Sequence, residues 1–217
     1  MIKRRDFVRG CGIASFLGMS FSLSDELAAK DLFKRKPHPF CSTTDSIAEN
    51  ITLGKVKWNR NNFRYCIATR DLEDLSQELW DNEFKLAFDS WSEVTPLTFE
   101  QVELHDEFDL IIAVGSRMAE GFGQEGGVLA WAQMPPAKKF DGILLSKFDL
   151  AENWILPDSE EAGIILRSVA AHEIGHLLGL PHTNDPKALM YPYINNSLKP
   201  KSDDIKKIQK LYGKPEK

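Results

Sequence analysis

The chain has little histidine and cysteine, and it has no long apolar run beyond its first residues. Five histidines and three cysteines occur in 217 residues. Beyond residue 24 no stretch of 18 apolar residues occurs, so the rest of the sequence predicts no membrane-spanning helix. The formal net charge is −5, and residues 1–24 hold four basic and one acidic side chain, so the remainder is more acidic still. This balance argues against nucleic acid as a partner.

The first residues resemble an export signal. Lys3-Arg4-Arg5-Asp6-Phe7-Val8-Arg9 is similar to the twin-arginine signal, in which paired arginines precede an aromatic, an apolar and a basic residue. The apolar stretch Ile13–Leu23 is short and diluted by small residues, as in a leader that is removed after Ser24 or after Ala29. A general secretory signal with a fortuitous arginine pair is the alternative. Either signal predicts export from a bacterial cytoplasm, to the periplasm or outside the cell.

The most informative string is His172-Glu173-Ile174-Gly175-His176, which is followed by His182. On a helix, His172 and His176 project from one face, so both imidazoles can reach one ion. Gly179 can take the left-handed conformation that ends a helix and turns the chain back, which lets His182 approach the same ion. Three protein ligands leave the fourth position of a tetrahedral zinc to water, the arrangement of a catalytic site.

The alternative is a purely structural role, in which the segment is a buried helix whose histidines only pack in the core. Residues 164–178 are largely apolar, and three histidines with a glutamate are costly in such surroundings unless they bind something. Chance is a poor explanation, because the five fixed positions should match in on the order of one in ten million windows. The sequence therefore predicts a metal site with ligands His172, His176 and His182, and with Glu173 beside it.

This motif is similar to that of the metzincin zinc proteases, and in particular to the matrixin branch. Thr183 follows the third histidine, where matrixins carry Ser or Thr. Ala188-Leu189-Met190-Tyr191-Pro192 resembles the matrixin Met-turn, and flanking segments extend the likeness over about residues 53–214. The resemblance implies an α+β fold of the metzincin or zincin type. Such a fold has a twisted, mixed five-stranded sheet, three main helices and an active-site cleft over the second helix.

The resemblance also implies a zinc-dependent endopeptidase that acts on protein or peptide substrates. In such an enzyme zinc lowers the pKa of its bound water towards ~7, and Glu173 is the general base. Met190 would lie under the three imidazoles as an apolar floor and not as a ligand. The alternative is a zincin-fold binding or inhibitory protein that keeps metal without turnover. The intact Glu173 favours the enzyme.

Substrate contacts follow from the same resemblance. In matrixins the strand similar to Val128–Ala132 borders the cleft, and an extended substrate adds to it by backbone hydrogen bonds. A pocket beyond the scissile bond would have small Ser168 at its floor, which predicts room for a sizeable apolar side chain. The residues implied in binding substrate are Val128, Leu129, Ala130, Ser168, Pro192, Tyr193 and Ile194.

The likeness departs from many vertebrate matrixins at their second, structural zinc, which three histidines and an aspartate bind. No histidine lies between His105 and His172, and Trp131 stands where one of those ligands would fall. We therefore expect one catalytic zinc and no structural zinc. Calcium is left open: Asp149 and Glu152 lie where a matrixin calcium site would draw ligands, but acidic loops are more often only solvated.

The segment before the expected domain contains Pro39-Phe40-Cys41-Ser42-Thr43. Matrixin proenzymes resemble one another in a Pro-Arg-Cys-Gly motif whose thiolate fills the open zinc position, but the match here fails beyond the cysteine. We favour a disulfide between Cys41 and Cys66 over a zinc-blocking thiol, since an exported protein meets an oxidising compartment. The expected layout is a leader over 1–24, a linker or short propeptide over 25–52, and one catalytic domain over 53–217 that acts as a monomer.

Periodicity predicts the remaining elements. A half-buried strand is expected within 58–70, followed by a helix that Asp74 or Ser76 caps and whose apolar face runs from Trp80 to Trp91. The glycine-rich stretch Gly115–Gly127 is expected to be a mobile surface loop. At the last helix, Asp203 and Asp204 either cap it or form a matrixin pair, one tied to the processed N-terminus and one buried near the Met-turn. Strands are also expected at 97–102, 110–114, 128–133 and 143–145, and helices at about 160–178 and 201–211.

Overall fold

The structure is a computed structural model that describes residues 40–43, 56–68, 75–115, 122, 126–136 and 138–215. The expected leader, its cleavage points and most of the glycine-rich loop lie outside these residues. All described residues belong to one unit that spans Pro37–Lys217. Within the described part of the chain, no helix is both long enough and apolar enough to cross a membrane.

A mixed sheet forms one layer of this unit, with the strand order β1-β6-β8-β5-β3-β4. Strands β4, β3, β5 and β8 run parallel to one another, and β6 runs antiparallel to β8. The five strands from β6 to β4 make up the mixed sheet of the expected fold, and β1 adds a sixth strand along the outer side of β6. The strands are β1 (Phe40–Thr43), β3 (Asn62–Ala68), β4 (Thr98–Gln101), β5 (Leu110–Gly115), β6 (Val128–Ala132) and β8 (Leu144–Asp149).

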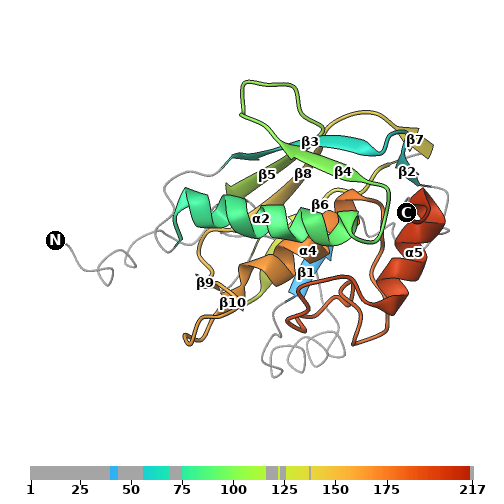
Figure 1. Ribbon diagram of the computed structural model, residues 1–217. Coiled ribbons are helices and arrows are strands. Elements are labelled where there is room, and N and C mark those ends of the chain that lie inside the picture. Colours follow the sequence, from blue (N-terminus) through green and yellow to red (C-terminus); the bar gives the residue numbers. More distant parts are fainter. Residues whose placement is uncertain are drawn as a thin grey trace, which may run out of the picture. The chain divides into compact units, whose positions relative to one another are not determined.

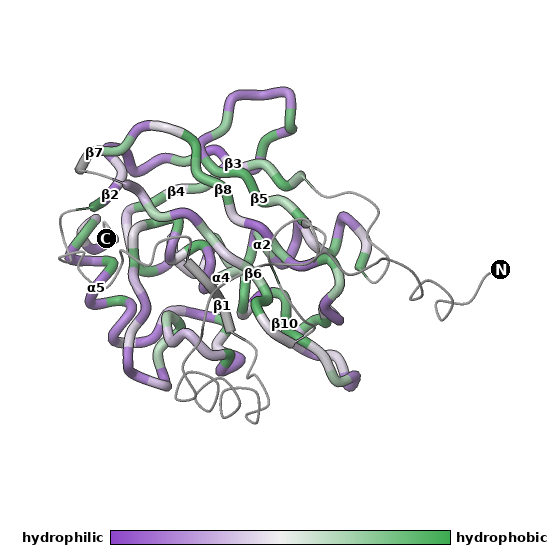
Figure 2. The backbone as a smooth tube through the Cα atoms, turned by 180° about the vertical axis from the view of Figure 1, so that it is seen from behind, coloured by the Kyte–Doolittle hydropathy of each residue, from purple (hydrophilic) through white to green (hydrophobic). Residues whose placement is uncertain are grey.

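The hydrophobic pattern explains which strands are central. Leu110 and Ile112 of β5 are fully buried, as predicted for an apolar central strand. Figure 2 shows hydrophobic colour along β3 and β5, whereas the connection between β4 and β5 is mostly hydrophilic. Two short pairs lie outside the main sheet: β2 (Lys57–Trp58) with β7 (Lys138–Phe140), and β9 (Trp154–Ile155) with β10 (Ile164–Ile165).

Helix α2 (Gln77–Ser92) starts at Ser76, whose hydroxyl accepts a hydrogen bond from Leu79 N at 3.4 Å. Its predicted apolar face is confirmed, and every member of that face is buried. The rings of Phe84 and Phe148 of β8 lie 5.1 Å apart edge to face, so the helix is packed against the sheet by aromatic contacts. The buried face consists of Trp80, Phe84, Ala87, Phe88 and Trp91.

Helix α4 (Leu166–Leu177) packs beside α2, and α5 (Ser202–Tyr212) closes the chain, as Figure 1 shows. The expected start of α4 near residue 160 is wrong. Ile164 and Ile165 form strand β10 instead, and Ile164 N donates to Asn153 O at 2.8 Å. A Cβ at Gly163 would lie 2.7 Å from the same carbonyl oxygen, so glycine permits this close approach and the helix begins after it.

Three hydrogen bonds hold α4 in place from neighbouring elements. Trp91 Nε1 of α2 donates to Ala171 O at 3.0 Å. At the other end, Trp58 Nε1 donates to Leu177 O at 2.7 Å, and the Tyr212 hydroxyl donates to Leu178 O at 2.8 Å. The last carbonyl groups of a helix have no partner within the helix, so the bonds to Leu177 and Leu178 satisfy such groups in the protein interior. Helix α4 is therefore fixed near its middle by α2 and at its C-terminal end by β2 and α5.

Candidate active site

Helix α4 carries His172, Glu173 and His176 in the middle of the core. His172 is 4% exposed, Glu173 is 1% exposed and His176 is fully buried. Such burial of three polar side chains is unfavourable unless their polar atoms find partners. Both histidines do so through Nδ1: that of His172 lies 2.7 Å from Leu189 O, and that of His176 lies 2.7 Å from Leu180 O.

The turn after α4 brings the third histidine back. Gly179 has a φ of +97°, which confirms the predicted left-handed conformation. Gly179 N donates to His176 O at 2.8 Å, and Leu180 N donates to Gly175 O at 2.9 Å. A Cβ at position 179 would lie 2.9 Å from Val56 O, so the turn needs glycine for its space as well as for its φ.

The three imidazoles meet at their Nε2 atoms. Nε2 of His172 lies 3.0 Å from that of His176 and 3.2 Å from that of His182, and the third separation is 3.1 Å. Around a tetrahedral ion with Zn–N bonds of about 2.05 Å, the nitrogen separations would be roughly 3.3 Å. The observed triangle is only a few tenths of an ångström smaller, so its dimensions suit a zinc ion.

The protonation of the rings also suits a metal. A backbone carbonyl only accepts, so Nδ1 of His172 and of His176 carries the proton and Nε2 presents a lone pair. Burial lowers the pKa of His172 to about 3 and that of His182 to about 4, and burial lowers the pKa of His176 well below its usual value. Neutral imidazoles whose lone pairs face one another repel unless a cation lies between them. In the part of the chain that the structure describes, this is the one group of three or more His, Cys, Asp or Glu side chains arranged to hold a metal.

The segment under the histidines is built on a buried carboxylate. Met190 is fully buried, and a Cβ at Gly175 would collide with its Sδ, so the glycine between the two helical histidines makes room for it. Asp204 of α5 is fully buried and accepts from Leu189 N at 2.7 Å and from Met190 N at 3.1 Å. It also accepts from Lys201 N at 2.8 Å, so it caps α5 and holds this turn at the same time.

A comparison with protein-family models shows to which family the chain belongs. The Matrixin family model matches residues 57–213, which is more than half of the chain. The chain belongs to the matrixin family. Matrixins are zinc-dependent, so zinc is the metal for which the three histidines are positioned.

Relatives from plants and animals agree with this assignment. The chain is 38% identical to Metalloendoproteinase 1-MMP of Arabidopsis thaliana over 175 residues, which cover 74% of this chain and 45% of that protein. It is 37% identical to Matrix metalloproteinase-16 of Homo sapiens over 187 residues, or 78% and 29% of the two chains. It is 39% identical to Stromelysin-2 of Rattus norvegicus over 186 residues, or 81% and 37%. The chain spans less than half the length of each of these relatives.

The strand that the matrixin resemblance assigns to substrate is paired on both sides. Strand β6 pairs with β8 on one side and with β1 on the other, where Phe40 lies opposite Val128 and Cys41 lies opposite Ala130. The side chains of Leu129 and Ala130 are fully buried, so at these two positions β6 can offer an extended peptide only its backbone. Residues 40–43, from the expected linker or short propeptide, thus lie along the edge at which a substrate strand would add.

A small hollow lies beside His172. Ser168 lines it, as the resemblance implies, and so do Tyr193 and Ile194; Pro192 is not among the lining residues. Its volume is about 10 Å³, room for about one water molecule. The pocket is therefore narrower in this structure than the small serine suggested, and a sizeable apolar side chain enters only if its walls shift. The remaining lining residues are Val169, Leu189, Tyr191 and Asn195.

The favoured disulfide between Cys41 and Cys66 is wrong. Cys66 has a free, buried thiol in β3, and burial raises its pKa. Strands β6, β8 and β5 lie between β1 and β3, which separates the two strands by roughly 19 Å at the usual strand spacing. A disulfide joins Cα atoms that are about 4.4–6.8 Å apart. The sheet order therefore excludes the bond.

The residues considered for further metals have other contacts in the structure. Asp149 is fully buried and accepts from Ala151 N at 2.9 Å, and the nearly buried Glu152 accepts from Gly126 N at 2.9 Å. These contacts do not test calcium binding, which the sequence left open. Trp131, at the position of a structural zinc ligand in many matrixins, lies opposite Lys147, whose Nζ is 5.9 Å from its ring centroid. A cation–π contact thus joins β6 and β8 there.

Sequence reasoning missed several residues that support the site. Leu180 and Leu189 orient two histidines through backbone oxygens, which no residue type reveals. Trp58 and Tyr212 fix the end of α4 from distant parts of the chain. Gly175 alone carried a usable signal, because a glycine inside a helical motif is unfavourable unless something packs closely against it.

Proposed function

We propose that this chain is a zinc-dependent endopeptidase that hydrolyses peptide bonds of protein or peptide substrates. The observation that carries the proposal is the meeting of three histidine Nε2 atoms within 3.0–3.2 Å of one another, with Glu173 next to His172 on the same helix. Membership of the matrixin family supports the same reaction. Because the chain spans less than half of its relatives, its own activity and substrates are part of the proposal.

Each side chain has a definite task in this reaction. The imidazoles of His172, His176 and His182 would hold zinc, which acts there as a Lewis acid on water and on the substrate carbonyl. Glu173 would accept a proton from the attacking water and deliver it to the leaving amine. Its burial keeps bulk water away from the carboxylate.

Substrate recognition would use the two features beside the histidines. The backbone of Val128, Leu129 and Ala130 would bind an extended peptide as an added strand once β1 has left. The side chain that follows the scissile bond would enter the hollow at Ser168, with Tyr193 and Ile194 at its wall and Pro192 next to them in the chain. Both features explain why an extended, unfolded stretch of protein is the expected substrate form.

The decisive experiment compares the wild-type protein with Glu173→Gln on a library of quenched peptides. Both proteins should contain one zinc, because glutamate is not a ligand. The variant should lose about 10²- to 10⁴-fold in kcat/KM, since it lacks the general base. Equal cleavage by both proteins, or none by either, would contradict the endopeptidase and favour a zincin-fold protein that binds metal without turnover.

We also propose that the protein is exported from a bacterial cytoplasm to the periplasm or beyond, and that it acts as a monomer. The support for export is the twin-arginine-like segment Lys3–Arg9, which lies outside the described residues. Replacement of Arg4 and Arg5 by lysine should retain the chain in the cytoplasm if the twin-arginine route is used. Export that continues unchanged would favour the general secretory route, and gel filtration with light scattering tests the monomer.

A further inference from the structure

The third ligand differs from the other two in how its backbone is held. His172 and His176 lie within α4, where helix hydrogen bonds fix the backbone, and their Nδ1 atoms contact carbonyl oxygens. His182 lies in a stretch, residues 181–190, that forms neither helix nor strand. The position of its imidazole therefore depends on contacts that neighbouring loop residues make.

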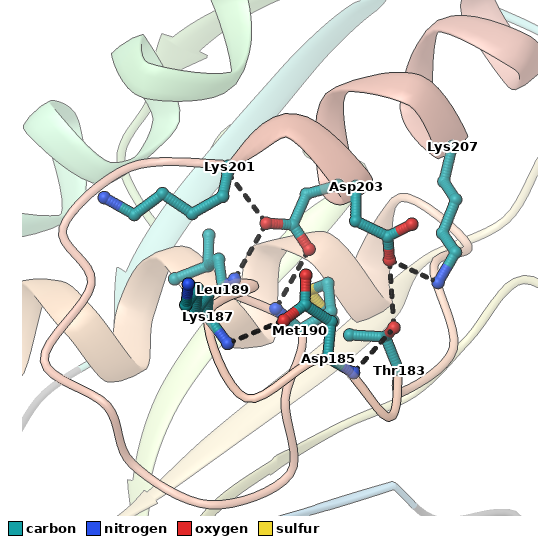
Figure 3. A network of polar contacts seen from close by, with 9 residues as sticks. Thr183, Asp185, Lys187, Leu189, Met190, Lys201, Asp203 and Lys207 are labelled. Atoms are coloured by element: carbon teal, nitrogen blue, oxygen red, sulfur yellow. Dashed lines mark hydrogen bonds and ion pairs between the residues drawn. The ribbon is translucent and has the colours of Figure 1, made fainter.

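The residue after His182 makes two such contacts, in different directions. The hydroxyl of Thr183 donates to Asp203 Oδ2 of α5 at 2.9 Å (Figure 3). The backbone N of Thr183 donates to Met190 O at 3.0 Å. The peptide that follows the third ligand is thus tied to the turn beneath the histidines by its backbone and to α5 by its side chain.

Asp203 is turned towards Thr183 and does not cap its helix. Asp204 caps α5 instead, because it accepts a hydrogen bond from Lys201 N. The Asp203 oxygen that receives the threonine hydroxyl also lies 2.7 Å from Lys207 Nζ, one turn further along α5. The hydrogen bond from Lys207 holds the pKa of Asp203 below its usual value, so the carboxylate stays an ionised acceptor near neutral pH.

We propose that Asp203 is a positioning residue for the zinc ligand His182: acting through the hydroxyl of Thr183, it fixes the loop that carries this ligand and so slows the release of zinc. The carboxylate touches neither metal nor substrate. It acts one residue away from the ligand, in the same way that outer partners of metal ligands tune affinity elsewhere. The inference rests on zinc at the three histidines and is independent of peptide cleavage.

The test measures the rate of zinc release from the purified, zinc-loaded protein to a chromogenic chelator. Thr183→Val removes the hydroxyl but keeps the shape of the side chain, and Asp203→Ala removes the accepting carboxylate. Each should release zinc roughly 10- to 100-fold faster than the wild-type protein. Thr183→Ser restores a hydroxyl and should return the rate to within about threefold of wild type. The double variant should be no worse than the single ones, because both remove the same link.

Lys207→Met is the matched control, since it removes the ion pair with Asp203 but leaves the threonine contact. Its zinc release should stay close to the wild-type rate. Additive effects of Thr183→Val and Asp203→Ala, or wild-type release from both, would overturn the proposal, as would zinc release from Lys207→Met as fast as that from Asp203→Ala. If Thr183→Val does not fold, Asp203→Ala compared with Lys207→Met still decides. Peptide cleavage is not used, so this proposal and the peptidase proposal fail separately.

Discussion

The metal side and the substrate side of this site are held in different ways. On the metal side, two imidazoles are fixed by carbonyl oxygens at 2.7 Å, and the turn under them is held by the fully buried Asp204. On the substrate side, Tyr193 is 47% exposed, the hollow it lines holds about 10 Å³, and β6 is covered by β1. Buried, fully bonded groups keep one geometry, whereas exposed walls and a four-residue strand can rearrange. The three histidines are thus preorganised, and under the proposed function substrate binding would require movement.

The largest effect on zinc content and peptide cleavage should follow from loss of one of the two histidines on α4. His176→Ala leaves two imidazoles, and zinc should not survive purification, so metal analysis should find less than about a tenth of an equivalent. Peptide cleavage should disappear with it. His105→Ala is the matched control, since His105 is exposed and far from the motif in sequence, and it should keep both metal and activity. Full zinc content in His176→Ala would show that the ion lies elsewhere.

The next largest effect should be a loss of stability when the packing beneath the histidines is changed. Gly175→Ala places a methyl group against Met190 Sδ and 3.0 Å from the Trp91 ring, so it should destabilise the protein by about 1–3 kcal/mol. Urea unfolding of the zinc-loaded protein measures this. In a Met190→Ala background most of the clash is gone, and the same substitution should cost much less. A penalty that is equal in both backgrounds would mean that Met190 does not set the need for glycine.

On the substrate side, weakening β1 should increase activity. Proline has no N–H, and successive strand residues point their N–H groups to opposite sides, so Ser42→Pro with Thr43→Pro must remove one ladder position that faces β6. A loss of about 1–2 kcal/mol in β1 pairing should expose β6 roughly 5- to 30-fold more often and raise kcat/KM accordingly. Zinc content should not change. Unaltered or slower cleavage would show that β1 does not obstruct substrate.

The smallest effect should come from the pocket wall. Tyr193→Ala removes a ring that lines the hollow and leaves the histidines and the residues that orient them unchanged in sequence, so zinc content should stay at the wild-type level. The preference between large and small apolar side chains after the scissile bond should shift by up to about tenfold in kcat/KM. Peptides that vary only at this position measure the shift. Loss of zinc in this variant would show that the pocket wall also helps to hold the metal ligands.

The same division explains what the sequence could predict. The ligands, Gly179 and the apolar face of α2 depend on residue type and spacing within one helix or turn, and the structure confirms their placement. The partner of β6 could not be found this way, since four residues without a hydrophobic period carry no strand signal. The disulfide between Cys41 and Cys66 is predicted only from the oxidising compartment that an exported protein meets. The order of strands in the sheet places the two cysteines on strands that are too far apart for it.

The start of α4 shows why a local sequence pattern cannot always predict whether a segment forms a strand or a helix. The run through Ile164–Leu166 is apolar in either conformation, and tertiary contact decides between them: Ile164 bonds to Asn153, and Gly163 packs on the same residue. The link between Thr183 and Asp203 is similar, because it joins positions 20 residues apart that share no pattern. Predictions from sequence were strongest where one element supplies the whole feature.

Titration of the metal-free protein with zinc, followed by cleavage of a quenched peptide, tests whether one zinc ion at the three histidines carries peptide hydrolysis. We expect no cleavage in the presence of chelator, and then activity that rises and saturates at one equivalent of zinc in the wild-type protein. Glu173→Gln should bind the same equivalent without comparable turnover. Cleavage by the metal-free protein, activity that keeps rising to a second equivalent, or no cleavage at any zinc level would contradict a single catalytic zinc at this site.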